Sequence, residues 1–149
     1  MTTSMFPNAG APFWLYPDDE NKREVWTVGN NVAPGTVVAS ADGTYVGVTI
    51  TGSDDFAGSV QFGPYTLSGI PLGGVGHAAD QATVATTGTP YLTVEGATTS
   101  TVQGTPVYWD ATNKELTLTA GGTAVGRVNL HPGMVLDGTH LPVKIGVIA

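Results

Sequence analysis

Residues 36–50 have the sequence Thr36-Val37-Val38-Ala39-Ser40-Ala41-Asp42-Gly43-Thr44-Tyr45-Val46-Gly47-Val48-Thr49-Ile50. Two runs dense in β-branched side chains, 36–39 and 45–50, lie on either side of the dipeptide Asp42-Gly43. β-branched residues favour strands, and Asp-Gly supplies the positive backbone φ angles that tight hairpin turns require. The stretch therefore predicts a β-hairpin.

The same pattern continues along the chain from residue 25 to the C-terminus. Glycine, asparagine or aspartate separates the runs, and Gly121-Gly122 predicts a second tight hairpin turn, whereas 110–114 predicts a longer hairpin loop. Short strands at intervals of about 8–12 residues are typical of barrels and sandwiches. The further runs rich in β-branched and aromatic residues are 25–28, 59–62, 91–94, 107–109, 115–119, 125–128 and 143–148.

Helical periodicity is missing from the sequence, and we expect no helix longer than two turns. Glycines inside predicted strands, at Gly47 and Gly126, indicate bulges or bends of the kind that a closing barrel needs. The expected fold class is all-β. It is a compact antiparallel β-barrel or sandwich over residues 25–149, preceded by an extended N-terminal arm over residues 1–24.

The composition excludes several classes of protein. The chain has 5 Lys and Arg against 12 Asp and Glu, a net charge of −7, so too few cations exist to neutralise a phosphate backbone and we expect no nucleic-acid partner. The absence of cysteine excludes disulfides, thiolate metal sites and cysteine nucleophiles. No apolar run approaches 18 residues and the first seven residues lack the features of a signal peptide, so neither a membrane partner nor a leader is expected.

Charged residues are also scarce, at 11% of the chain against about 25% in ordinary soluble domains. A small domain with so few charges must cover its surface with uncharged polar side chains, or be covered by another protein. The second possibility is the first indication of a binding role.

The predicted arm, residues 1–24, differs in composition from the rest. Its prolines at positions 7, 12 and 17 favour an extended path, and a short extended arm cannot bury its own aromatic rings. The arm folds back over its own domain, docks on a neighbouring subunit or on a partner protein, or is disordered, although disordered tails are usually poor in aromatic residues. The charged stretch 18–24 is the expected joint between arm and barrel. Aromatic anchors often dominate interface energetics, so the candidate binding residues are Phe6, Phe13, Trp14 and Tyr16.

The residues that usually carry catalysis do not occur in catalytic patterns. The histidines His77, His131 and His140 are isolated in loop-like sequence, which favours ordinary loop histidines over metal ligands or bases. Asp54 and Asp55 are adjacent on an extended segment, so their side chains point apart, as in a solvated loop. The segment 74–79 fits Gly-x-Gly-x-x-Ala, but β-branched residues follow it where a nucleotide-binding helix is required. We therefore expect no enzyme activity and no cofactor.

A resemblance to a known family is carried by residues towards the C-terminus. Val102-Gln103-Gly104-Thr105-Pro106-Val107-Tyr108-Trp109-Asp110, followed by Leu116-Thr117 and Val125-Gly126-Arg127-Val128, resembles the C-terminal signature of small tailed-phage capsid decoration (cement) proteins. The earlier segments 34–38 and 46–48 are similar to the N-terminal hairpin of that family.

The resemblance implies a structural protein without enzymatic activity. Its implied location is the virion, on the outer surface of the capsid, and its implied partners are the major capsid protein and two further copies of itself in a homotrimer. Such a protein stabilises the shell because it binds only the assembled lattice.

An alternative interpretation is a carbohydrate- or receptor-binding β-domain of a virion surface protein. The rings of Trp14, Tyr16, Trp26 and Trp109 could stack on sugars, while loop Asp and Asn side chains bind hydroxyl groups. Against this alternative, Trp26 and Trp109 occur in predicted strands, which favours a place in the core.

Overall fold

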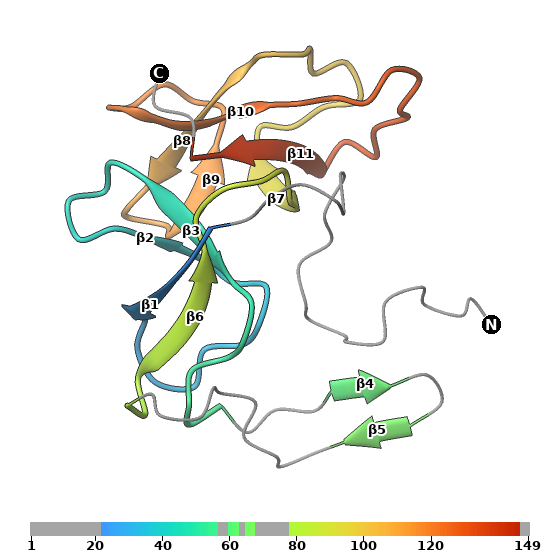
Figure 1. The fold of residues 1–149 in the computed structure, drawn as a ribbon. Coiled ribbons are helices and arrows are strands. Elements are labelled where there is room, and N and C mark those ends of the chain that lie inside the picture. The colour runs from blue at the N-terminus through green and yellow to red at the C-terminus, as the bar shows by residue number, and fades with distance from the viewer. Residues whose placement is uncertain (1–21, 57–59, 63–64, 68–77, 147–149) are drawn as a thin grey trace. The chain divides into compact units, whose positions relative to one another are not determined.

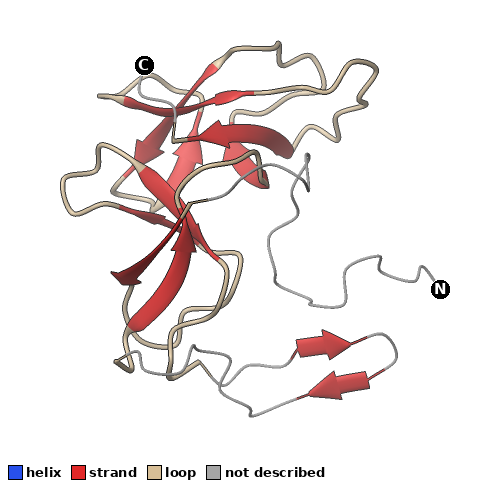
Figure 2. Ribbon diagram, viewed as in Figure 1, coloured by secondary structure: helices blue, strands red, loops and turns tan. Residues whose placement is uncertain are grey.

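The computed structural model describes residues 22–56, 60–62, 65–67 and 78–146. All the regular elements among these residues are β-strands, and none is a helix (Figure 2). The prediction of an all-β fold is confirmed. The predicted arm residues 1–21 lie outside the described residues, as does most of the segment 74–79.

Internal contacts divide the chain into two compact units. Of the described residues, the first unit contains those within Arg23–Thr36 and Val48–Ala85. The second contains Lys22, those within Val37–Gly47 and those from Thr86 onwards. A short two-stranded sheet of β4 (Val60–Phe62) and β5 (Tyr65–Leu67) occurs within the sequence of the first unit.

A four-stranded sheet has the order β1-β6-β3-β2 (Figure 1). Its strands are β1 (Arg23–Thr27), β6 (Gln81–Ala85), β3 (Val46–Thr49) and β2 (Val37–Ala39). β1 and β3 each pair with β6 in antiparallel register. β1 begins at Arg23, within the stretch predicted as the arm, because an edge strand tolerates the charged side chains of Arg23 and Glu24.

The predicted hairpin at Asp42-Gly43 is confirmed. β2 and β3 are neighbours in the sheet, and Ser40 N donates to Tyr45 O at 2.9 Å across the turn. Gly43 has a φ of 70°, the conformation for which glycine is favoured.

The second unit contains a closed five-stranded barrel with the order β10-β11-β7-β9-β8. Its pairs are antiparallel except for β7 and β9, which run parallel. Large aliphatic side chains fill its interior, among them Val107, Leu116, Val125, Leu141 and Val143, each at most 2% exposed. The strands are β7 (Tyr91–Glu95), β8 (Pro106–Asp110), β9 (Glu115–Thr117), β10 (Ala124–Val128) and β11 (His140–Ile145).

Two local predictions about the barrel have different outcomes. The longer hairpin loop is confirmed, since β8 and β9 pair from Asp110 opposite Glu115. The tight hairpin predicted at Gly121-Gly122 is wrong, because β9 and β10 do not pair and each instead pairs with β8. Gly122 does turn the chain, with a φ of 88°, but barrel closure places another strand between the two that it joins.

Trp26 and Trp109, predicted to lie in the core, are both half-buried, and Trp109 lies on the core-facing side of β8, because its partner across the strands is the buried Leu116. Trp26 Nε1 donates to Glu24 Oε2 at 2.7 Å. An indole N–H needs a hydrogen-bond partner, and the exposed carboxylate of Glu24 supplies one for Trp26.

The predicted bulge at Gly126 is confirmed. The register between β10 and β8 shifts between Ala124 and Gly126. A Cβ atom on Gly126 would lie 2.8 Å from Lys144 O and 2.9 Å from Val143 Cγ1, both on the neighbouring β11. The absent side chain is therefore what allows β11 to lie so close to β10.

We expect Gly126→Ala to destabilise the fold by about 1–3 kcal/mol, because the new methyl group overlaps the backbone of β11. Urea unfolding followed by circular dichroism measures this change. Gly121→Ala is the matched control, because a Cβ at Gly121 meets no atom within 4 Å. Equal midpoints for the two variants would contradict the close approach at Gly126.

Candidate functional site

The four aromatic residues predicted to bind a partner, Phe6, Phe13, Trp14 and Tyr16, lie outside the described residues. Their role as anchors stays a prediction. Among the described residues, polar and acidic side chains line a groove at the surface of the barrel.

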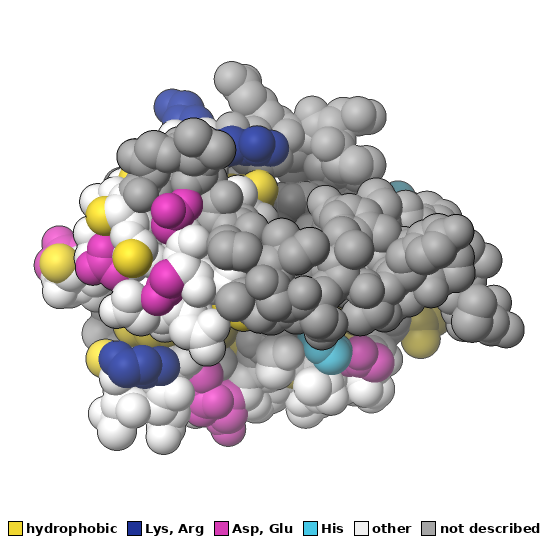
Figure 3. All heavy atoms as spheres, turned by 90° about the horizontal axis from the view of Figure 1, so that it is seen from below, with side chains coloured by type: hydrophobic (Ala, Val, Ile, Leu, Met, Phe, Trp, Pro, Cys, Tyr) yellow, Lys and Arg dark blue, Asp and Glu magenta, His cyan; other side chains and the backbone are white. Residues whose placement is uncertain are grey.

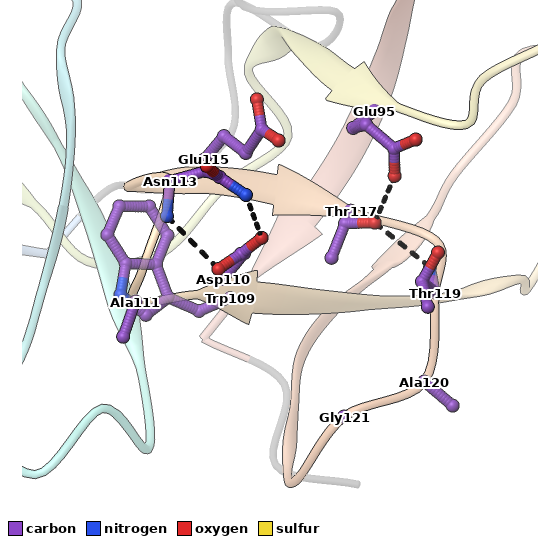
Figure 4. A pocket seen from close by; sticks show the side chains of 10 residues that line it. All are labelled: Glu95, Trp109, Asp110, Ala111, Asn113, Glu115, Thr117, Thr119, Ala120 and Gly121. Carbon is purple, nitrogen blue, oxygen red and sulfur yellow. Dashed lines mark hydrogen bonds between the residues drawn. The ribbon is translucent and has the colours of Figure 1, made fainter.

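A groove of about 590 Å³ lies on the outer side of β7, β9 and β8 (Figure 4). Strand register places Glu95 beside Thr117, and Asp110 opposite Glu115. Trp109 borders the groove beside Asn113 in Figure 4, but its partner across the strands is the buried Leu116. Paired residues share one face of a sheet, so the indole leaves its strand on the side of the core.

Two of the three acidic side chains that line the groove, Glu95 and Asp110, are engaged in local structure. Glu95 Oε2 accepts from Thr117 Oγ1 at 2.5 Å. Asp110 accepts from Asn113 Nδ2 at 2.8 Å and from the backbone N of Asn113 and Thr112, and these bonds lower its pKa. A general acid or base near neutral pH needs the opposite shift in a carboxyl pKa. Asp110 therefore fixes the β8–β9 loop.

Asp54 and Asp55 lie in a loop, as predicted, and Asp55 also makes contacts that the sequence did not predict. Its carboxylate accepts from Asn31 N at 2.9 Å, from Ser53 Oγ at 2.7 Å and from Asn30 Nδ2 at 2.8 Å, and these bonds lower its pKa. Asp55 thus joins two loops that are far apart in sequence. An adjacent pair of acids gives no signal for such a distant contact.

A tripeptide that occurs twice, Asp-Gly-Thr, forms two similar turns. In 42–44 and in 137–139 the aspartate Oδ1 accepts from the backbone N of the threonine, at 3.1 and 2.8 Å respectively. The intervening glycines have φ angles of 70° and 86°. From the sequence, only the first copy was predicted to form a turn, although both copies of the tripeptide can be seen there.

The second of these turns holds a histidine that the sequence assigned to a loop. His140 is the first residue of β11; its Nδ1 lies 2.9 Å from Asp137 Oδ2, and its ring stacks on Tyr91 at a centroid distance of 5.4 Å. Backbone donation from His140 and Thr139, then the His140 side chain, lowers the pKa of Asp137 to about 2. Burial, then the charge of Asp137, raises the pKa of Tyr91.

The other two histidines differ from His140. His131 is exposed in a loop, as predicted, with Nδ1 2.8 Å from Pro132 O, and His77 lies outside the described residues. Within those residues no group of three His, Asp or Glu side chains is placed to hold a metal ion. The same part of the chain contains no helix long and apolar enough to cross a membrane.

We expect Asp137→Asn to lower the melting temperature at neutral pH. The folded state holds the pKa of Asp137 near 2, below the ordinary 3.8, so the carboxylate stabilises the fold above pH 3.8 and this contribution disappears as the pH falls towards 2. The difference between wild type and Asp137→Asn should therefore shrink over that range, measured by thermal unfolding. Asp54→Asn controls for the loss of one charge, and a difference independent of pH would contradict the role of Asp137.

Comparison with known proteins finds no matching family model, no matching curated protein and no matching solved structure. The function is therefore inferred from features of the chain itself. These features are the two compact units, the aspartates that hold turns and loops, and the small number of charged residues.

Proposed function

We propose that this chain is a structural decoration protein of a phage capsid, which binds the outer surface of the head and stabilises the shell. The observation that carries the proposal is how the acidic side chains are used. Asp42, Asp55, Asp110 and Asp137 all have lowered pKa values because each accepts several hydrogen bonds within a turn or between loops. Side chains engaged in this way serve a stable scaffold rather than proton transfer.

The residues that resemble the decoration family support the proposal through their place in the fold. They form β8, β9 and β10, consecutive strands of the closed barrel. The closed barrel has no free sheet edge, so this unit resists unwanted pairing with other chains, whereas the four-stranded sheet keeps β1 and β2 as edge strands. This property suits a protein that is displayed in many copies at high local density.

Stabilisation of a shell by such a protein follows from mass action. A ligand that binds only the assembled lattice favours that lattice by its binding free energy. Repetition over many equivalent sites turns a modest affinity per copy into a large resistance to internal pressure. The proposed partner is the major capsid protein, and the net charge of −7 steers the chain towards basic patches on the shell.

The proposal includes a homotrimer, in solution or on the shell, and an N-terminal arm that docks on a neighbouring subunit or on the shell protein. The arm's aromatic residues Phe6, Phe13, Trp14 and Tyr16 are the proposed anchors. Prolines restrict the unbound arm, so it loses less conformational entropy on docking than a flexible arm would.

We expect deletion of residues 1–17 to weaken attachment to capsids strongly while leaving the melting temperature nearly unchanged. Phe13→Ala with Trp14→Ala should reproduce most of this loss, because large aromatic anchors dominate binding. The measurement is co-sedimentation with expanded empty heads of the phage that encodes the chain. Tyr45→Ala is the control, since Tyr45 is an exposed aromatic residue outside the arm.

Three outcomes would contradict this proposal. If full-length protein does not co-sediment with heads, the decoration role is wrong. If truncation unfolds the protein, the arm belongs to its own core. If a glycan array shows specific binding while heads do not bind, the carbohydrate-binding alternative takes the place of the decoration role.

A further inference from the structure

Two loops lie side by side at one end of the barrel (Figure 1). The first, 96–105, joins β7 to β8, and the second, 129–139, joins β10 to β11. We use the name two-loop surface for residues 96–105 and 129–136. Neither stretch contains a single Asp, Glu, Lys or Arg.

Side-chain and backbone contacts hold the two loops together. Gln103 Oε1 accepts from Leu130 N, and Gln103 Nε2 donates to Asn129 Oδ1 at 3.1 Å. Further along, a Cβ on Gly138 would lie 3.7 Å from Thr99 Cγ2. The loops therefore form one surface rather than two independent segments.

The two-loop surface carries the two most exposed large hydrophobic side chains among the described residues. Val135 is 90% exposed and Val102 is 66% exposed. Elsewhere the apolar side chains visible on the described part of the face in Figure 3 occur singly among polar and acidic ones. Two strongly exposed valines on adjoining loops thus distinguish this end of the barrel.

The loop that presents Val135 is fastened on both sides of it. Leu136, the next residue, is buried at 7% exposure, and Asp137 then forms the turn that starts β11. On the other side, Met134 N donates to His131 O at 3.0 Å. A loop whose backbone is already held in place loses little conformational entropy when it binds a partner.

We propose that the two-loop surface is where a second copy of this chain binds. This inference rests on the self-association included in the proposed function and names the surface that carries it. Each copy has a net charge of −7, so copies repel one another and a contact that buried carboxylates would leave them unpaired. At a surface without charges, two copies can meet without burying unpaired carboxylates.

Charge also distinguishes a second copy from a basic partner. A surface built for a basic partner carries complementary acidic groups, and residues 96–105 and 129–136 have none. The one acid of these loops, Asp137, accepts hydrogen bonds from its own turn. The core of a protein–protein interface is depleted in charged residues.

The test is the molar mass in solution, measured by light scattering during gel filtration over a range of protein concentrations. We expect wild type to be oligomeric, and Val102→Asp with Val135→Asp to weaken association roughly tenfold or more, because charge enters the apolar centre of the contact. Ala111→Asp with Thr123→Asp adds the same charge at exposed positions outside the two-loop surface and should leave the mass unchanged. Val102→Ser with Val135→Ser removes the apolar groups without adding charge and should also weaken association.

A monomeric wild type at all concentrations would overturn the inference, as would unchanged oligomers in both valine double variants while circular dichroism shows them folded. Loss of association only on deletion of residues 1–17 would assign self-contact to the arm and also overturn it. The capsid proposal fails separately, when oligomeric wild type does not co-sediment with heads. Oligomers that the valine variants disrupt would then still support the two-loop surface.

Discussion

The close approach of β11 to β10 at Gly126 is the constraint on which the barrel depends. β11 pairs with both β10 and β7, so it links the two parts of the barrel wall, and β10 closes the ring through its bulged pairing with β8. With Lys144 O at 2.8 Å from a Cβ position, the backbone itself occupies the space of a side chain. The buried valines and leucines of this unit are enclosed only because that ring is complete.

The turns show how a chain with few charges uses its acids. Four aspartates hold turns or loops through several hydrogen bonds each, and their lowered pKa values mean that they remain ionised well below neutral pH. An ionised carboxylate that accepts backbone N–H groups makes stronger hydrogen bonds than a neutral acceptor. Four of the twelve acidic residues are thus part of the architecture of the turns and loops.

Elements that depend on residues close together in the sequence could be predicted, whereas pairings between strands far apart in the sequence could not. The Asp42-Gly43 hairpin and the loop at 110–114 were predictable because a turn and its two flanking strands are local. Gly121-Gly122 has equally good turn chemistry, but barrel closure puts β8 between the strands that it joins. β6 was missed as a strand because its alanines weaken the β-branched pattern, although Ala82, Val84 and Ala85 are buried. The site predictions in the arm rest on composition alone, and no distant partner of Asp55 could be found from an adjacent pair of acids.

With few charges and two exposed valines on the two-loop surface, the specificity of binding there depends on shape. Surface charges keep proteins apart and soluble. A surface without charges avoids unspecific association only if its exposed apolar area is small. On the two-loop surface, the two strongly exposed apolar side chains, Val102 and Val135, are single residues on loops that hydrogen bonds hold in position. Such a surface gains little from an unmatched contact, because one valine buries little area. It gains more from a partner whose shape places both valines at once, and specificity then comes from geometry rather than from charge.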